Sequence, residues 1–196
     1  MHLKRLLAVK GIHFLATRFG SPQLRSWAFD EKYRLGHWSF SGDGPELFKT
    51  VQNYLRGGRL LMLGCGGATL LDDLDSKDYT EVLGVDLSEE ALRLAQRFAS
   101  DKVSFVKGDM TTFQPARRYE VILFSESLNY LATKIASRCL QRLSQDLDHQ
   151  GVFVVTFAQS DRYAEWIEMI RTSFAVVEDR KFTGAQRHLL VFRGKS

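Results

Sequence analysis

Short apolar runs alternate with helix-like periodicities along most of the chain. Between the runs, apolar residues recur at helical spacing, for example at Leu131, Ile135, Cys139 and Leu143, which predicts amphipathic helices. Alternation of this kind is typical of an α/β fold in which helices cover both faces of a parallel sheet. The runs with the length of buried strands lie at residues 58–63, 80–86, 102–109, 119–127 and 151–157.

Two further runs, at residues 174–179 and 187–193, are joined by a glycine-containing link. This arrangement predicts a hairpin that closes the sheet. Doubly wound sheets bind ligands beyond the carboxyl ends of their strands, where the strand order reverses. Functional residues are therefore expected at the strand ends.

The composition is that of a single globular domain. The chain has 196 residues, of which 44% are hydrophobic, enough for a sizeable core. No apolar run approaches the ~18 residues of a membrane-spanning helix. Two cysteines, with no cluster of cysteine and histidine, predict neither a disulfide framework nor a metal site. These features favour a soluble, cytoplasmic protein.

Basic residues are concentrated near the start of the chain. Residues 1–29 carry a charge of +5 and the whole chain +4, so the remainder sums to −1 and does not predict nucleic-acid binding. Residues 1–20 interleave apolar and basic positions, as in a helix that covers the domain. A helix lying on a partner protein or on the inner, anionic face of a membrane has the same pattern. An organelle targeting peptide also has this basic, amphipathic pattern, although residues 1–20 are poor in serine.

Glycines interrupt the apolar pattern where the first predicted strand ends, in "LLMLGCGGATLL" (residues 60–71). Counted from Gly64, the last position of a dinucleotide-binding Gly-x-Gly-x-x-Gly fingerprint is Thr69, so the fit to that fingerprint is poor. Asp86 ends the second predicted strand and Asp109 follows the third. An acid at the first of these places can accept both hydroxyls of a ribose, and one at the second can accept a hydrogen bond from an adenine amino group. Together these elements predict a site for a nucleoside-containing ligand.

With these motifs, residues 45–193 resemble the class I S-adenosylmethionine-dependent methyltransferase superfamily, whose first motif is here "LLMLGCGGA". The resemblance implies a Rossmann-like, seven-stranded, mostly parallel sheet with an antiparallel last strand. It also implies S-adenosyl-L-methionine as cofactor, with the glycine loop under its methionine portion, Asp86 on the ribose and Asp109 on the adenine. Met62 replaces an acid common in the family, and Ala68 replaces the last glycine. The expected cofactor contacts in the core are Gly64, Cys65, Gly66, Asp86, Leu87, Asp109, Met110 and Ser125.

Two short segments resemble the nodulation protein S type of small-molecule methyltransferase, whose members methylate amines of sugars and related metabolites. They are "FDEKYRLGHW" (29–38) and "YEVILFSESLNYL" (119–131). The resemblance divides the chain into a helical lid segment at 1–44 and a methyltransferase domain at 45–196. It implies that Tyr33 and Trp38 close over the cofactor, although packing of an N-terminal helix would also explain them.

Methyl transfer is an in-line displacement, so positioning of the acceptor contributes much of the acceleration. An amine acceptor must be neutral or must lose a proton to a nearby group. Glu126, at the end of the fourth predicted strand, is the first candidate for a base or for holding an ammonium group, and His37 is the second. Asn129 and Tyr130 are candidates for orienting the acceptor, a small molecule with an amine or a hydroxyl.

Two other classes of function use the same sheet. A nicotinamide-dependent oxidoreductase is opposed by Thr69 in the glycine pattern. A methyltransferase-like protein that binds cofactor weakly and acts as a partner subunit is supported by Met62.

Overall fold

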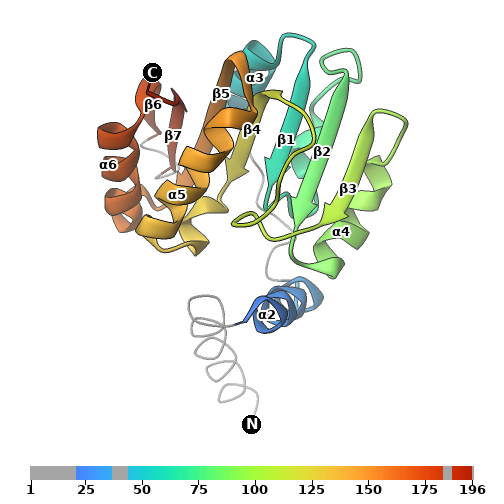
Figure 1. Ribbon diagram of the computed structural model, residues 1–196. Coiled ribbons are helices and arrows are strands. Elements are labelled where there is room, and N and C mark those ends of the chain that lie inside the picture. Colours follow the sequence, from blue (N-terminus) through green and yellow to red (C-terminus); the bar gives the residue numbers. More distant parts are fainter. Residues whose placement is uncertain (1–20, 37–43, 183–186, 196) are drawn as a thin grey trace.

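The computed structural model describes residues 21–36, 44–182 and 187–195, which fold around one twisted sheet (Figure 1). In the described residues the sheet has seven strands in the order β3-β2-β1-β4-β5-β7-β6. The order reverses between β1 and β4, which are neighbours. The strands are β1 (Arg59–Leu63), β2 (Glu81–Asp86), β3 (Val103–Lys107), β4 (Tyr119–Ser125), β5 (Leu147–Ala158), β6 (Ala175–Phe182) and β7 (Arg187–Arg193).

The pairing of the strands confirms the predicted fold class. Strands β1 to β5 pair in parallel, whereas β7 runs antiparallel to both β5 and β6. The last strand of the chain is thus inserted between β5 and β6, and β6 forms the edge of the sheet.

Helices lie on both faces of the sheet, as the alternating pattern predicts. Helices α5 (Thr133–Leu143) and α6 (Ala164–Ser173) cover one face, and α3 (Gly44–Leu55) and α4 (Glu89–Ala95) lie on the other. Because both faces are buried, β4 is apolar at consecutive positions: Ile122 and Phe124 point to one core, Val121 and Leu123 to the other.

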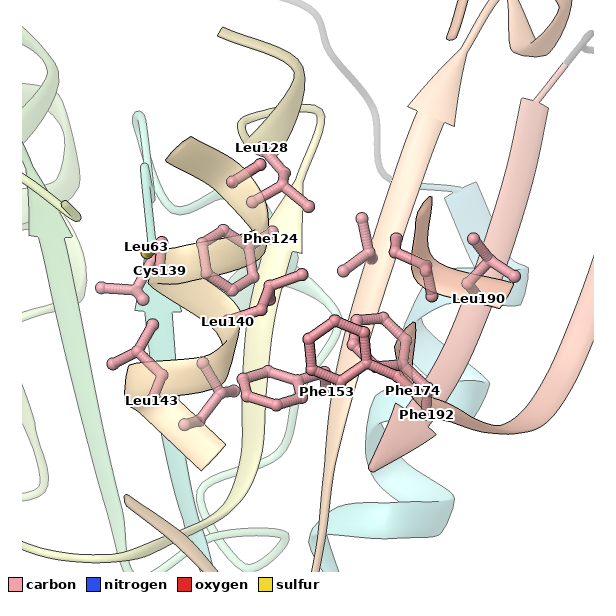
Figure 2. Packing of buried hydrophobic residues seen from close by; sticks show 14 of the residues in the cluster. Leu63, Phe124, Leu128, Cys139, Leu140, Leu143, Phe153, Phe174, Leu190 and Phe192 are labelled. Atoms are coloured by element: carbon pink, nitrogen blue, oxygen red, sulfur yellow. The ribbon is translucent and has the colours of Figure 1, made fainter. Parts of the chain in front are cut away.

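Aromatic rings fill the core beneath α5 and α6 (Figure 2). Phe192 of β7 stacks on Phe153 of β5 at a centroid distance of 5.2 Å, and Phe174 packs on Phe192 at 5.1 Å. This packing fixes β5 and β7 relative to each other in the core. The predicted stripe on α5 is wrong at one place, because Ile135 is 46% exposed. Steps of four residues turn 40° past a full helical turn, so the buried face shifts to Ala136 and Leu140.

Helix α2 (Pro22–Arg34) lies outside these layers, beyond the carboxyl ends of β1 and β2 (Figure 1). Its N-cap is Ser21, whose hydroxyl accepts a hydrogen bond from the backbone N–H of Leu24 at 3.3 Å. The basic stretch 1–20 and the candidates His37 and Trp38 lie outside the described residues. Within the described ranges, no helix combines the length and the apolar character needed to cross a membrane.

Candidate active site

A cavity of about 320 Å³ lies at the carboxyl ends of β1, β2 and β4 and is bounded on one side by α2. It is at the switch point of the strand order, where sheets of this type bind ligands. Most of the residues predicted from the sequence line it, namely Tyr33, Gly64, Cys65, Gly66, Asp86, Leu87, Asp109, Met110, Ser125, Glu126 and Tyr130.

Two glycines of the loop after β1 have positive φ angles, and each lies against a different neighbouring residue. Gly64 has a φ of 69°, and a Cβ atom there would lie 2.5 Å from the Cβ of Ser127. Gly66 has a φ of 56°, and a Cβ atom there would lie 2.6 Å from the Tyr33 hydroxyl. The backbone of Gly64 is therefore bare because the chain after β4 packs against it. Of the two glycines, only Gly66 faces a side chain of α2.

The carboxylate of Asp86 joins the loops that follow β1 and β2. Its Oδ2 accepts a hydrogen bond from the N–H of Gly66 and its Oδ1 one from the N–H of Ser88, both at 2.9 Å. Burial raises the pKa of Asp86, against the opposing effect of these hydrogen bonds. Because a carboxylate has about four acceptor positions, Asp86 can hold the loop and still accept hydroxyl groups of a ligand in the cavity.

Asp109, after β3, is held from two sides. Its Oδ1 accepts hydrogen bonds from the N–H of Thr111 at 3.0 Å and from the hydroxyl of Thr111 at 2.8 Å. Its Oδ2 pairs with Nη2 of Arg25 at 2.5 Å. Helix α5 also holds this loop, because Arg142 donates to the carbonyl of Met110 at 3.0 Å. The carboxylate therefore has one orientation at the cavity wall.

Arg25 and Phe29 line the cavity but are not among the residues predicted from the sequence. They come from α2 together with Tyr33, at intervals of four residues, so one face of this helix forms a wall of the cavity. This spacing is visible in the sequence and would have indicated that Arg25 and Phe29 share the face of Tyr33.

Helix α2 is docked on the start of α4 by polar contacts. Ser26 donates to the carbonyl of Leu87 at 2.9 Å, and the hydroxyl of Ser88 donates to Asp30 at 2.6 Å. The N–H of Glu90 also donates to Asp30, at 3.2 Å. Ser88 is the N-cap of α4 and accepts a hydrogen bond from the N–H of Ala91. Asp30 thus adds a negative charge at the positive end of α4, which stabilises the docked helix.

Glu126 lies at the cavity and has a left-handed backbone conformation, with a φ of 51°. Its Oε2 accepts a hydrogen bond from the N–H of Ala158. Its Oε1 lies 3.6 Å from Nε of Arg187. The ends of β4 and β5 and the start of β7 therefore hold this carboxylate in place. Its role as a base remains a prediction.

Tyr130 forms another part of the wall and contacts α2. Its ring meets the ring of Phe29 edge to face at a centroid distance of 5.3 Å. Nζ of Lys32 lies 5.7 Å from the centre of the Tyr130 ring. Burial lowers the pKa of Lys32 from 10.5 to about 8 and raises the pKa of the Tyr130 hydroxyl.

Asn129 is not brought to the cavity, in contrast to the prediction. It lies in the 3₁₀ turn Leu128–Tyr130, where successive side chains point about 120° apart. Tyr130 faces the cavity and Asn129 does not. Cys65 does line the cavity, but burial raises the pKa of its thiol, so it is not an activated thiolate.

Comparison with known proteins finds similarity to methyltransferases. Residues 60–151 match the family described as a methyltransferase domain. The chain is 28% identical over 141 residues to the eEF1A lysine and N-terminal methyltransferase of Bos taurus. That alignment covers 69% of the chain and 20% of the relative, so the chain spans about a fifth of the length of this curated protein.

Solved methyltransferase structures share the fold. N-methyltransferase NodS from Bradyrhizobium japonicum WM9, in complex with S-adenosyl-L-homocysteine, aligns with a TM-score of 0.62 at 18% identity, over 81% of the chain and 92% of NodS. A TehB-like SAM-dependent methyltransferase from Corynebacterium glutamicum aligns with a TM-score of 0.66 at 20% identity, over 86% of the chain and 99% of that protein. The chain is thus similar to methyltransferases in sequence over residues 60–151 and shares its fold with solved S-adenosylmethionine-dependent methyltransferases.

Proposed function

We propose that this protein binds S-adenosylmethionine in the cavity and methylates an amine or a hydroxyl of a small molecule, such as a sugar or a related metabolite. The observation that carries the proposal is the convergence of three strand-end elements on one cavity. They are the loop at Gly66, the carboxylate of Asp86 and the carboxylate of Asp109. These residues fit the cofactor, because they offer bare backbone, a buried acceptor for ribose hydroxyls and an acceptor for an amino group.

The bound cofactor supplies an electrophilic methyl group on a sulfonium. The chain's own residues must position the acceptor and exclude water. Tyr33 and Phe29 of α2 form the wall that separates the cavity from solvent on one side. Glu126 is in place to orient an acceptor or to take its proton, because its carboxylate is fixed at the cavity by Ala158 and Arg187. Tyr130 offers an aromatic surface next to it.

The small-molecule acceptor is supported by the resemblance of residues 29–38 and 119–131 to small-molecule methyltransferases. The cavity, at about 320 Å³, is at the lower end of the range for ligand sites, roughly 300–1,000 Å³, and a cofactor of nucleoside and amino acid would take up about that volume. The similarity to a lysine methyltransferase raises a protein side chain as the alternative acceptor.

The test is incubation with cofactor labelled in its methyl group and three sets of acceptors: amino sugars and small amines, hydroxylated metabolites, and lysine-containing peptides. We expect label in a small molecule of the first or second set. Label found only in peptides would overturn the small-molecule proposal. Calorimetric titration with S-adenosylmethionine and with NADH, in the absence of an acceptor, identifies the cofactor independently of the acceptor. Binding of NADH alone would favour an oxidoreductase, and weak binding of both would favour a partner subunit.

A further inference from the structure

Three large apolar side chains of α2 and its C-cap are exposed to solvent. Leu24 is 43% exposed, Trp27 48%, and Leu35, the C-cap residue, 52%. Their spacing along the helix places them on one side of it, together with Glu31, and this side is called the outer face of α2. Of the eight large apolar side chains that are exposed in the described residues, these three lie within twelve positions of the chain. Exposed apolar side chains that gather in one patch mark interaction surfaces.

The charges next to the outer face favour an anionic partner. Glu31 is the acid on this face, and Arg34 neutralises it with an ion pair of 2.7 Å. The twenty residues that precede Ser21 in the sequence contain four lysines and arginines and no acid. An apolar helix face combined with an excess of positive charge is typical of helices that lie on anionic lipid.

The place of α2 in the fold leaves its outer face accessible. The helix lies outside the layers around the sheet (Figure 1). Its contacts with α4 come from another side of the helix, where Ser26 and Asp30 form their hydrogen bonds. Attachment through the outer face therefore leaves the docking of α2 and the wall of the cavity in place.

The length and composition of α2 fit a position along a membrane surface. Its 13 residues extend over about 20 Å, too short for the ~30 Å hydrocarbon core of a bilayer. Trp27 combines an apolar ring system with an N–H donor, and tryptophan is enriched at the level of the lipid headgroups for this reason.

We propose that the outer face of α2 attaches the protein to an anionic lipid bilayer. Leu24 and Trp27 enter the boundary between headgroups and acyl chains, and the basic residues that precede the helix are attracted to the anionic headgroups. Because another side of α2 forms a wall of the cavity, the attachment places the cavity beside the bilayer. The inference concerns where the protein acts and is independent of its cofactor and acceptor.

The test is sedimentation of the full chain with vesicles of phosphatidylcholine alone and of phosphatidylcholine mixed with anionic phosphatidylglycerol. The double variant Leu24→Ser/Trp27→Ser is compared with the wild type. Val177→Ser is the matched control, because Val177 is also an apolar residue, 47% exposed, but lies on the edge strand β6. Unfolding curves establish that each variant is folded.

We expect the wild type and Val177→Ser to bind anionic vesicles at least about tenfold more tightly than neutral ones, because several basic residues contribute. Salt that shortens the Debye length from about 10 Å to about 3 Å should release them. Leu24→Ser/Trp27→Ser should bind anionic vesicles about tenfold more weakly or less, since two apolar side chains no longer leave water.

The emission of Trp27 reports directly whether this residue enters the bilayer. The chain has three tryptophans, so the variant Trp38→Phe/Trp166→Phe retains Trp27 alone. Its emission should shift to shorter wavelengths on addition of anionic vesicles and should be quenched by lipids with brominated acyl chains.

Four outcomes would overturn the inference. A wild type that does not sediment with anionic vesicles would assign the outer face to a protein partner or to another segment of this chain. Equal binding to neutral and anionic vesicles would remove the role of charge. An equal loss in Val177→Ser would mean non-specific adhesion. Trp27 that is not quenched in a chain that sediments would mean that another surface is attached. None of these outcomes bears on cofactor binding or methyl transfer.

Discussion

The hydroxyl of Tyr33 occupies the space that a side chain on Gly66 would need. A Cβ atom on Gly66 would lie 2.6 Å from the Tyr33 oxygen, but 3.8 Å from the nearest ring carbon, Cζ. A single oxygen atom, at the tip of the Tyr33 side chain, therefore has to shift if residue 66 carries a Cβ atom. Removing that oxygen would leave an ordinary van der Waals distance.

This contact predicts strongly non-additive effects of two substitutions. Gly66→Ala should destabilise the fold by about 2–4 kcal/mol, because alanine both clashes with Tyr33 and adopts a left-handed conformation. In a Tyr33→Phe background only the conformational cost of about 1–2 kcal/mol should remain. Denaturant unfolding of the wild type, both single variants and the double variant measures the difference. Additive effects would mean that Tyr33 does not lie over the loop.

A second prediction concerns Asp86. Asp86→Ala removes the acceptor of both the Gly66 and the Ser88 N–H groups and the acceptor assigned to the ribose. Binding of S-adenosylhomocysteine should weaken by about 1.5–3 kcal/mol. Asp86→Asn keeps one acceptor oxygen and should lose less. Asp101→Ala, at an exposed turn, is the control and should bind as the wild type does. A folded Asp86→Ala variant with unchanged affinity would remove Asp86 from the site.

The fold was predictable because its determinants are local along the chain. The consecutive apolar residues of β4 reflect burial on both faces, and Ser88 followed by Glu89 and Glu90 marks the start of α4. The acids at the ends of β2 and β3 could also be predicted to lie close together, because parallel strands bring their carboxyl ends to one edge of the sheet.

The contacts of α2 could not be predicted in this way. The ion pair of Arg25 with Asp109 and the hydrogen bond of Ser88 to Asp30 link residues 84 and 58 positions apart. They depend on how an isolated helix docks, which no local periodicity encodes. The close approach of Gly64 to Ser127 is of the same kind, so the pattern of glycines was visible while its cause was not.

A third prediction tests the chemistry assigned to Glu126. Glu126→Gln keeps the shape of the side chain and an oxygen that can accept from Ala158, but it can neither take a proton nor balance Arg187. Turnover should fall by about 10²–10⁴, the range for a lost general base, while the affinity for S-adenosylhomocysteine stays within a few-fold. Glu168→Gln, on the exposed side of α6, is the control. Full activity would move the proton transfer elsewhere, with His37 as the next candidate. A loss of cofactor affinity would instead place Glu126 in the cofactor site.

The last prediction concerns Lys32, whose ammonium group is partly buried over Tyr130. Burial lowers its pKa from 10.5 to about 8, so between these values the folded state binds fewer protons than the unfolded state. The free energy of unfolding therefore rises with pH between about 8 and 10.5. Below about pH 8 the buried charge lowers the stability of the fold by its full amount, and above about pH 10.5 this loss of stability is gone.

Lys32→Met should therefore be more stable than the wild type near pH 7, and the difference in unfolding free energy should shrink as the pH is raised from 8 to 10.5. The rate at which the Lys32 amine is acylated, followed by mass spectrometry, reports its pKa directly, because only the neutral amine reacts. Its pH profile should have a midpoint near 8. The profile of exposed Lys77, whose pKa is raised by Asp75, should have a midpoint above 10.5 in the same experiment. A shared midpoint for the two lysines would mean that Lys32 is solvated and that α2 does not pack against Tyr130 as described.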